Sequence, residues 1–289
     1  LEEAGYAAPT PTTNGRYVAA IFATGELVCV DRKGERKWIK HLGIPQNHYG
    51  HTSSLLCHGD LLFVQYDQKN HSQIFAFDIV TGKLTWSAKR NSMSWSSPIL
   101  VERNGTKQLV LTDSNAAEGY DLTSGKSLWR LECLSGEVAS SAAYANGRVF
   151  VANEGAPATA IDCSVPEPKT LWHWDESLPD SASPVANEKY LIVPTAFGVV
   201  SCLDAKTGKL MWEHEFDQGF SSSPILAGGL VYLIDVSGNL QIFKMGGEFE
   251  LVGTYDVEEP VYATPAFVDD RIYIRSLGHL VCVQQTQVK

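Results

Sequence analysis

The sequence predicts an all-β fold, a seven-bladed β-propeller of four-stranded antiparallel blades. A motif made of an Asp, a Gly turn and a Trp recurs along the 289 residues. Its Trp residues stand at positions 38, 86, 129, 172 and 212, a spacing of 40 to 48 residues, which is the length of one propeller blade. No stretch shows a sustained apolar period of 3.6 residues, so helices are not expected.

The third repeat shows the predicted blade most clearly. Residues 96–101, 108–111, 119–121 and 127–130 are short β-branched or aromatic runs bounded by Gly, Asn, Asp or Ser, and we predict them as strands A to D. Repeats of this kind build one domain despite the length of the chain. The predicted units are 6–48, 49–92, 93–136, 137–178, 179–218, 219–259 and 260–289 with an N-terminal strand.

The Asp, Gly and Trp residues of the repeat have structural explanations. An Asp accepts backbone N–H bonds across the turn from strand C to strand D, and a Gly takes the positive φ that closes this turn. A Trp removes much apolar surface from water when it wedges between neighbouring blades. We therefore predict structural roles for Asp78, Gly82, Trp86, Asp121, Gly125, Trp129, Asp204, Gly208 and Trp212.

The pattern Asp-x-x-Thr-Gly-Lys-x-x-Trp, seen at 78–86 and 204–212, resembles the repeat of the PQQ-type β-propeller family. The resemblance covers essentially the whole chain. Known members of this group are the quinoprotein alcohol dehydrogenases and the outer-membrane assembly lipoprotein BamB. The repeat specifies the fold, whereas function has to be argued from a site.

The seventh repeat has expected strands at 263–267, 271–274 and 279–283 but no fourth strand. The segment Tyr6 to Pro9 aligns with Trp95 to Pro98, so we expect the N-terminal residues before it to close the last blade. An upstream segment of a longer precursor would complete blade seven or add an eighth blade. Closure is expected because an unpaired strand edge favours aggregation.

Composition excludes several classes of partner. The net charge is −10 and the Lys and Arg residues form no cluster, so nucleic acid binding is not expected. The longest apolar stretch, 190–203, is interrupted by Pro194 and Gly198 and is too short for a membrane-spanning helix. Cys29, Cys202 and Cys282 occupy equivalent positions of different blades, so we expect buried free thiols rather than disulfides.

Aromatic residues stand just before strand A in several repeats. Tyr6, Trp95 and Tyr262 are at equivalent positions, and Phe220 lies one position earlier in its repeat. Because strand A begins at one rim of the central funnel of a propeller, they predict a stacking platform for a planar or sugar ligand. The alternative is that these rings only plug the channel.

The loop 43–51 is unusually rich in polar and aromatic side chains. His48, Tyr49 and His51 lie in it, and Asp67 lies in the adjacent loop between strands B and C. Polar contacts to a ligand, a shared metal and ordinary loop packing all remain open for these residues. No third metal ligand is nearby in sequence, so no metal site is predicted.

The resemblance also implies tests for activity. Quinoprotein dehydrogenases use a pair of adjacent cysteines, a Ca²⁺ ion held by Glu and Asn, and a catalytic Asp, yet no two cysteines are adjacent in this chain. Motifs of serine hydrolases and zinc proteases are also absent from the sequence. No catalytic residue is therefore predicted, and no cofactor is expected, PQQ included.

The sequence favours a non-enzymatic, BamB-like scaffold of the cell envelope or extracellular space. The expected partner is a protein or a glycan, and the expected state is a monomer. A lipid anchor on an upstream segment would fit this reading, and so would a periplasmic, outer-membrane-associated or secreted location. Two alternatives remain: an enzyme related to the quinoprotein dehydrogenases, and a propeller that binds a carbohydrate or another small ligand in its central funnel.

Overall fold

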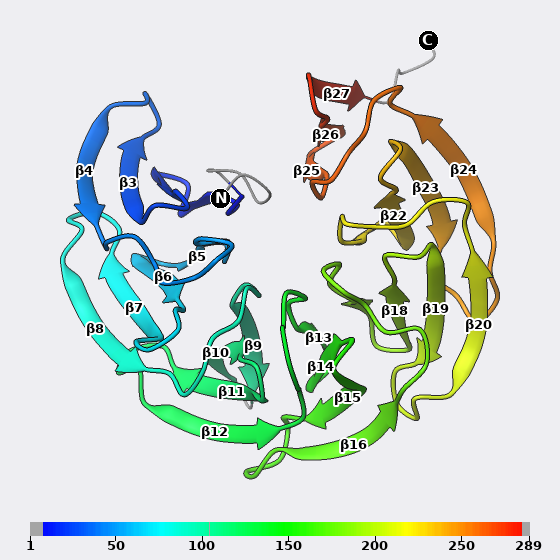
Figure 1. Ribbon diagram of the computed structural model, residues 1–289, viewed down its shortest axis with the longest axis horizontal. Coiled ribbons are helices and arrows are strands. Elements are labelled where there is room, and N and C mark those ends of the chain that lie inside the picture. The colour runs from blue at the N-terminus through cyan, green and yellow to red at the C-terminus, as the bar shows by residue number, and fades with distance from the viewer. Residues whose placement is uncertain (1–7, 104, 285–289) are drawn as a thin grey trace. The chain divides into compact units, whose positions relative to one another are not determined.

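The computed structural model describes residues 8–103 and 105–284, which fold entirely into strands and their connections (Figure 1). Contacts group the chain into two compact units. Unit 1 consists of residues 1–142 with 164–168, and unit 2 consists of residues 143–163 with 169–289.

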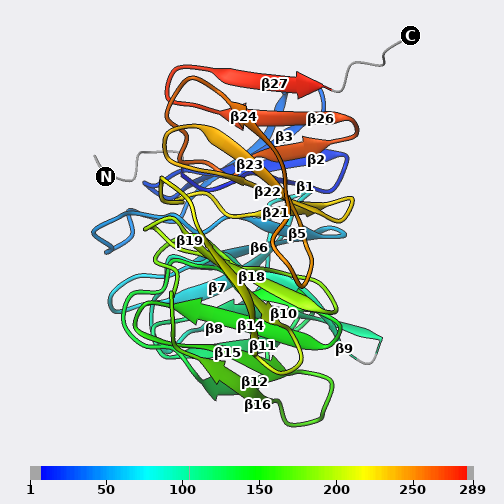
Figure 2. The same ribbon diagram turned by 90° about the vertical axis from the view of Figure 1, so that its right-hand side faces the viewer.

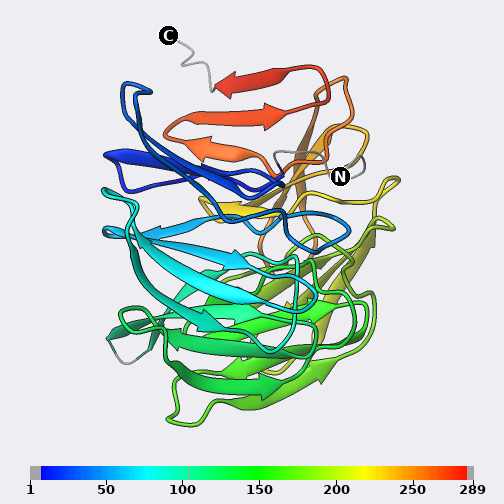
Figure 3. The same ribbon diagram turned by 60° about the vertical axis from the view of Figure 1, so that its left-hand side comes forward.

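Unit 1 contains three four-stranded antiparallel sheets whose strands lie side by side in chain order (Figure 3). Blade 1 contains β1 (Thr12–Thr13), β2 (Tyr17–Ile21), β3 (Glu26–Asp31) and β4 (Arg36–His41). Blade 2 contains β5 (Leu56–His58), β6 (Leu61–Tyr66), β7 (Gln73–Asp78) and β8 (Leu84–Lys89). Blade 3 contains β9 (Ile99–Arg103), β10 (Thr106–Thr112), β11 (Ala116–Asp121) and β12 (Ser127–Glu132).

Unit 2 contains four further sheets of the same antiparallel pattern (Figure 2). Blade 4 contains β13 (Ala143–Ala145), β14 (Arg148–Asn153), β15 (Ala156–Asp162) and β16 (Lys169–Trp174). Blade 5 contains β17 (Val185–Ala186), β18 (Tyr190–Pro194), β19 (Val199–Asp204) and β20 (Leu210–Glu215). Blade 6 contains β21 (Ile225–Ala227), β22 (Leu230–Ile234), β23 (Asn239–Lys244) and β24 (Leu251–Asp256). Blade 7 contains β25 (Ala266–Val268), β26 (Arg271–Arg275) and β27 (Leu280–Gln284).

The fold class is the predicted all-β, seven-bladed propeller. Each sheet falls within one predicted repeat, and the apolar segment 190–203 forms β18, a turn and β19 as expected. In blade 2 the B and C strands are buried or partly buried along their whole length, whereas the outer D strand contains only exposed and partly buried residues. Nowhere in the described ranges does a helix have the length and apolar character needed to cross a membrane.

The Asp and Gly of the repeat lie in the turn between strands C and D. The Asp78 carboxylate accepts bonds from the backbone N (2.7 Å) and hydroxyl (2.9 Å) of Thr81. Gly82 follows with a φ of 70°, a conformation that side chains disfavour. These bonds lower the pKa of Asp78, the backbone bond from Thr81 most strongly, so the carboxylate stays charged at neutral pH.

In several repeats the Trp of one blade covers the Gly of the next. The ring of Trp86 lies where a side chain on Gly125 would stand, 2.3 Å from the position of a Cβ, and its Nε1 donates to the carbonyl of Leu122 at 2.9 Å. Trp38 and Gly82 form the same pair between blades 1 and 2. The Gly is therefore required twice, by its φ and by the ring above it.

Trp129 contacts residues of its own blade instead of a Gly of the next blade. Its Nε1 donates to the Gln108 side chain at 3.0 Å, and its ring fills the space beside Gly119, whose Cβ would lie 2.0 Å from that nitrogen. Trp129 therefore packs against strands C and B of its own blade. The missing side chain at Gly119 provides room for this inward turn.

A chain of hydroxyl groups connects the starts of the A strands. The backbone N of Ser54 donates to the Ser97 hydroxyl at 2.9 Å, and the backbone N of Ser97 donates to the Ser141 hydroxyl at the same distance. In unit 2, Ser183 donates to Ser223 and Ser223 donates to Thr264, each at 2.9 Å. We call these bonds between Ser54, Ser97 and Ser141 in unit 1, and between Ser183, Ser223 and Thr264 in unit 2, the seryl ladder. It explains why a Ser or Thr recurs before the A strand.

The ladder corrects the predicted register of the first repeat. Thr10 donates to the Ser54 hydroxyl at 3.0 Å, and β1 pairs Thr12 with Ala19. Pro11, rather than Pro9, therefore occupies the position of Pro98, because the first A strand begins two residues later than the alignment placed it. The predicted closing segment before Tyr6 lies outside the described residues.

All six cysteines are free thiols in the structure. Cys29 and Cys202 are buried, as predicted, and burial raises the pKa of Cys202 to about 12. Cys282 is exposed instead. It lies on β27, the outermost described strand of blade 7, where no fourth strand covers it.

Candidate functional site

The loop 43–51 forms one wall of a cavity of about 610 Å³ within unit 1. The cavity lies among the loops that join a D strand to the next A strand and the turns between B and C strands, in blades 1 to 3. We call it the blade 1–3 cavity. Its lining residues are Gln46, Asn47, His48, Lys69, Met93, Trp95, Ser114, Gly136 and Glu137.

Two of the predicted site residues line this cavity and a third packs against them. The rings of His48 and Trp95 lie 5.6 Å apart at 70°, and Tyr49 contacts Trp95 edge-on at 5.4 Å and 69°. The indole Nε1 of Trp95 donates to the Asn47 side chain at 2.9 Å. The structure therefore brings His48, Tyr49 and Trp95 together, and their binding role stays a prediction.

Backbone hydrogen bonds fix the walls of this cavity. Lys69 N donates to the Gln46 carbonyl at 3.0 Å, and Trp95 N donates to the Val138 carbonyl at 2.8 Å. Ser114 N donates to the Met93 carbonyl at 3.0 Å. These bonds connect the loops that line the cavity to one another.

His51 does not reach the cavity. Its side chain is 3% exposed and stacks on Tyr66, with ring centroids 5.2 Å apart at an angle of 25°. Burial lowers the pKa of His51 to about 4, so the imidazole is neutral at physiological pH. It packs in the core of blades 1 and 2 and does not contribute to a ligand surface.

Asp67 is likewise buried rather than presented to a ligand. Its carboxylate accepts bonds from Arg90 Nε (2.8 Å), Gln65 Nε2 (2.8 Å) and Ser94 N (3.2 Å). Burial raises the pKa of Asp67, and the charge of Arg90 opposes this effect. The pair ties the B strand of blade 2 to the D strand and loop that follow it.

Phe220 and Tyr262, which were also predicted to form the stacking platform, do not line the blade 1–3 cavity with Trp95. Phe220 is 1% exposed and packs on Phe216 at 5.5 Å, because its backbone bond to Thr195 turns the ring into the core of unit 2. It is therefore not a stacking platform. Tyr262 is 56% exposed on unit 2, and Tyr6 lies outside the described residues.

Unit 2 carries a continuous surface of loops that the sequence did not single out. Backbone bonds join each B–C turn of blades 5 to 7 to the neighbouring D–A loop, and we call this surface the unit 2 loop face. Its segments are 153–155, 175–184, 195–198, 216–224, 235–238, 257–265 and 276–279. The bonds run from Phe216 N to Gly198 O (2.9 Å), Val236 N to Gly219 O (3.0 Å), Val257 N to Gly238 O (3.0 Å) and Leu277 N to Pro260 O (3.1 Å).

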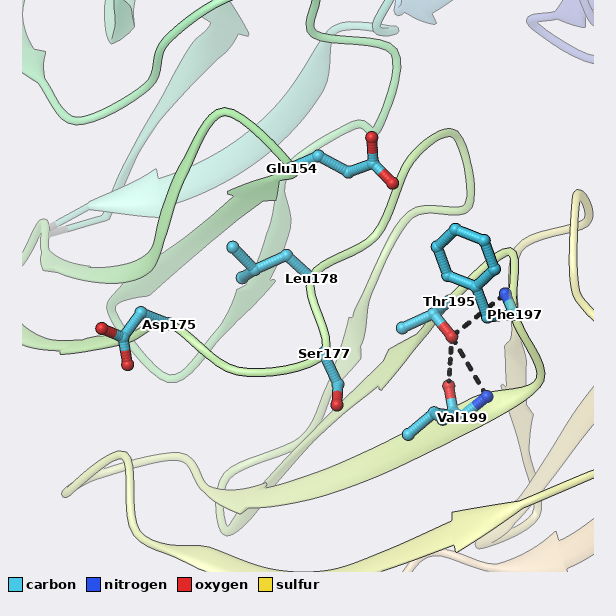
Figure 4. A pocket seen from close by; sticks show the side chains of 7 residues that line it. All are labelled: Glu154, Asp175, Ser177, Leu178, Thr195, Phe197 and Val199. Carbon is cyan, nitrogen blue, oxygen red and sulfur yellow. Dashed lines mark hydrogen bonds between the residues drawn. The ribbon is translucent and has the colours of Figure 1, made fainter.

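Phe197 is the most exposed large apolar residue of this face, at 79%. The Thr195 hydroxyl donates to the Val199 carbonyl at 3.0 Å and accepts bonds from the backbone N of Phe197 and Val199, which holds the turn rigid (Figure 4). Beside the ring is a cavity of about 290 Å³, lined also by Glu154 and Leu178. An aromatic ring held in solvent next to a hollow is a typical feature of a protein-binding surface.

The unit 2 loop face carries one sign of charge. Its segments contain eight Asp and Glu residues and no Lys or Arg, although Arg275 stands at the end of the adjoining β26. The turns at the opposite ends of the same strands carry Lys189, Lys206 and Lys209. Bonds from the Ser276 hydroxyl and Gly278 N lower the pKa of Glu259, which is therefore ionised at neutral pH.

Within residues 8–103 and 105–284, no three His, Cys, Asp or Glu side chains are grouped so that they could hold a metal ion. Sequence reasoning missed Lys69, Met93, Ser114 and Glu137 of the blade 1–3 cavity because they stand in four separate connections. It also missed Phe197, for which an aromatic residue between Thr and Gly in a short turn was the available signal.

Comparisons with known proteins identify the family. Residues 1–99, 70–182 and 165–246 match the family described as outer membrane protein assembly factor BamB. The crystal structure of BamB from Moraxella catarrhalis is similar with a TM-score of 0.77 and 17% sequence identity, over 98% of this chain and 84% of that one. The computationally designed Ika8 protein is similar with a TM-score of 0.63 and 14% identity, over 97% of this chain and 96% of that one.

No curated protein matches the chain by sequence. The two structural similarities are at low identity and show the fold alone. The family match, in contrast, covers well over half of the chain. The chain therefore belongs to the family of the outer membrane protein assembly factor BamB.

Proposed function

We propose that this chain is a non-enzymatic scaffold of the cell envelope that binds a protein partner during the assembly of outer-membrane proteins. The observation that carries the proposal is the family match, which spans residues 1 to 246 in three overlapping segments. A periplasmic or outer-membrane-associated location follows from the same relationship. The absence of adjacent cysteines in the sequence supports a scaffold over a quinoprotein dehydrogenase.

The proposed contact surface is the unit 2 loop face. Exposed aromatic and aliphatic side chains surrounded by charged residues are typical of hot spots with a polar rim. Phe197, Tyr262 and Leu277 are exposed there, and the surrounding charges are acidic. A partner segment that combines apolar residues with Lys or Arg is complementary to this surface.

Photo-crosslinking tests the surface directly. The variant Phe197→p-benzoylphenylalanine is expressed in the source cells, and crosslinked proteins are identified after irradiation. Leu84→p-benzoylphenylalanine on β8 is the matched control, because Leu84 is also an exposed apolar residue but lies on an outer strand of unit 1. We expect a crosslink from position 197 alone, to a segment of an envelope protein that contains both apolar and basic residues.

A second experiment tests the role in assembly. Cells that lack the protein are complemented with the wild type or with the triple variant Phe197→Ala, Asp217→Lys and Glu258→Lys. Loss of the apolar anchor and reversal of the rim charge are expected to weaken partner binding at least about ten-fold. Folded outer-membrane proteins should then fall to the level of the deletion strain, and full restoration by the triple variant would contradict the proposed surface.

A further inference from the structure

The blade 1–3 cavity points to a second binding function, independent of the unit 2 loop face. We propose that this cavity binds a neutral oligosaccharide, with the apolar face of one sugar ring against Trp95 and the hydroxyl groups on the surrounding polar side chains. The proposal depends on three properties of the cavity: its aromatic wall, its balanced charge and its fixed geometry.

The aromatic wall consists of an indole held in one orientation. The bond from Trp95 Nε1 to Asn47 fixes one edge of the ring, and the edge-on contacts with His48 and Tyr49 fix its tilt. Trp95 is half-buried and lines the cavity. A flat apolar surface of this kind suits the C–H face of a pyranose ring, which is itself flat and apolar.

The three aromatic rings do not form a cage around a cation. They contact one another, with the centroids of His48 and Tyr49 only 4.0 Å apart, and so leave no space between them for an ammonium group. Lys69 and Glu137 both line the cavity, so its wall has no excess of negative charge that would attract a cationic ligand. A quaternary ammonium ligand is therefore disfavoured.

The charges of the cavity wall cancel. Lys69 and Glu137 are its only Lys, Arg, Asp or Glu side chains, and His48 Nε2 lies 3.7 Å from a carboxylate oxygen of Glu137. A phosphate or sulfate group calls for more positive charge than one Lys provides. The balance therefore favours an uncharged ligand.

Polar groups for the hydroxyls of such a ligand are in place. The Asn47 side-chain oxygen accepts from Trp95 Nε1 and from Tyr49 N, so the orientation of the amide is set. Its two Nδ2 protons have no partner within the described chain. Together with Gln46, Lys69 and Glu137, the wall offers both donors and acceptors, as sugar hydroxyls need.

The volume and the backbone bonds complete the argument. About 610 Å³ lies within the ~300–1,000 Å³ range of small-molecule sites. Loops from three blades form the wall, and backbone bonds such as that from Lys69 N to Gln46 O hold them in place. Affinity is therefore gained without the cost of ordering a loop.

Isothermal titration calorimetry of the full chain tests the proposal. The probes are maltotriose, cellotriose and triacetylchitotriose as neutral sugars, and a trisaccharide of glucuronic acid as a charged one. We expect at least one neutral probe to bind with a millimolar or lower Kd. Trp95→Ala should weaken that probe at least about ten-fold, whereas Trp95→Phe, which keeps a flat ring and serves as the conservative variant, should retain most of the affinity.

The control is Tyr255→Ala, which removes an exposed aromatic ring from β24 of unit 2 and should leave the sugar affinity unchanged. Far-ultraviolet circular dichroism verifies that each variant is folded. The proposal is overturned if no neutral probe binds the wild type, if Trp95→Ala binds the probe as well as the wild type, or if the charged probe binds most tightly. None of these outcomes affects the crosslink from Phe197, so the two proposals fail separately.

Discussion

His51 should make the stability of the protein depend on pH between about 6.5 and 4. The ring is buried against Tyr66, and its Nε2 atom has no hydrogen-bond partner in the described part of the chain. Desolvation lowers the pKa of His51 from 6.5 to about 4, although a hydrogen bond with the Ser53 backbone opposes this shift. In the unfolded chain the imidazole titrates near its ordinary pKa.

The unfolded state therefore takes up the proton first as the pH falls. Stability is complete above pH 6.5 and is lost as the pH decreases towards the folded-state pKa. The interval between the two pKa values corresponds to about 3 kcal/mol, of which about 2 kcal/mol is lost by pH 5. The loss has this sign because protonating the buried ring places an unpaired charge in the core.

Urea unfolding at pH 8 and pH 5 measures this effect. The variant His51→Phe keeps a flat ring against Tyr66 but does not titrate, so its free energy of unfolding should change by about 2 kcal/mol less than that of the wild type between the two pH values. His48→Gln is the matched control, because it also removes an imidazole, but one whose side chain is 60% exposed rather than buried. If His51→Phe and the wild type lose equal stability, the folded protein accepts the proton and the argument from burial is refuted.

Two further variants test the packing of the repeat and the buried ion pair. Gly125→Ala should lower the free energy of unfolding by about 3 kcal/mol, because a Cβ there both strains the backbone and displaces the Trp86 ring. The control Gly34→Ala, with a similar φ and no atom within 4 Å of the Cβ position, should lower it by only about 1 kcal/mol. Equal losses would contradict the role of the ring. Asp67→Asn should lower the free energy of unfolding by about 3 to 5 kcal/mol, because it leaves the Arg90 charge buried and unpaired. The double variant Asp67→Leu with Arg90→Met should regain much of this stability in the same urea assay. A single variant as stable as the wild type would show that the ion pair is not needed.

The repeat made the architecture predictable, because its Asp and Gly residues are required by the local backbone conformation of one turn. The turn bonds of Asp78 and the positive φ of Gly82 are local features, so both can be predicted without knowing that the ring of Trp38 also covers Gly82. Trp129 shows where this reasoning ends. Its position in the repeat predicted a wedge between blades, but the small residue Gly119 on its own sheet provides a competing place for the ring.

The candidate site was predictable only in part, because a side chain's direction depends on its tertiary neighbours. His48 of the loop 43–51 and Trp95 were both singled out from the sequence, and they line one cavity. His51 lies three residues from His48 but points into the core. The acidic character of the unit 2 loop face was present in the sequence, but it became visible only after the connections were assigned to one end of the strands.

The seryl ladder bears on how a chain of this kind changes its number of repeats. In each link, one blade supplies a backbone donor and the next supplies a hydroxyl acceptor, as Ser97 does for Ser54 while donating to Ser141. A duplicated repeat would thus bring its own donor and its own acceptor and join the series with no group left unsatisfied. Duplication or deletion of a repeat can therefore lengthen or shorten such a protein without new kinds of contact between its blades, which leaves the loops free to diversify.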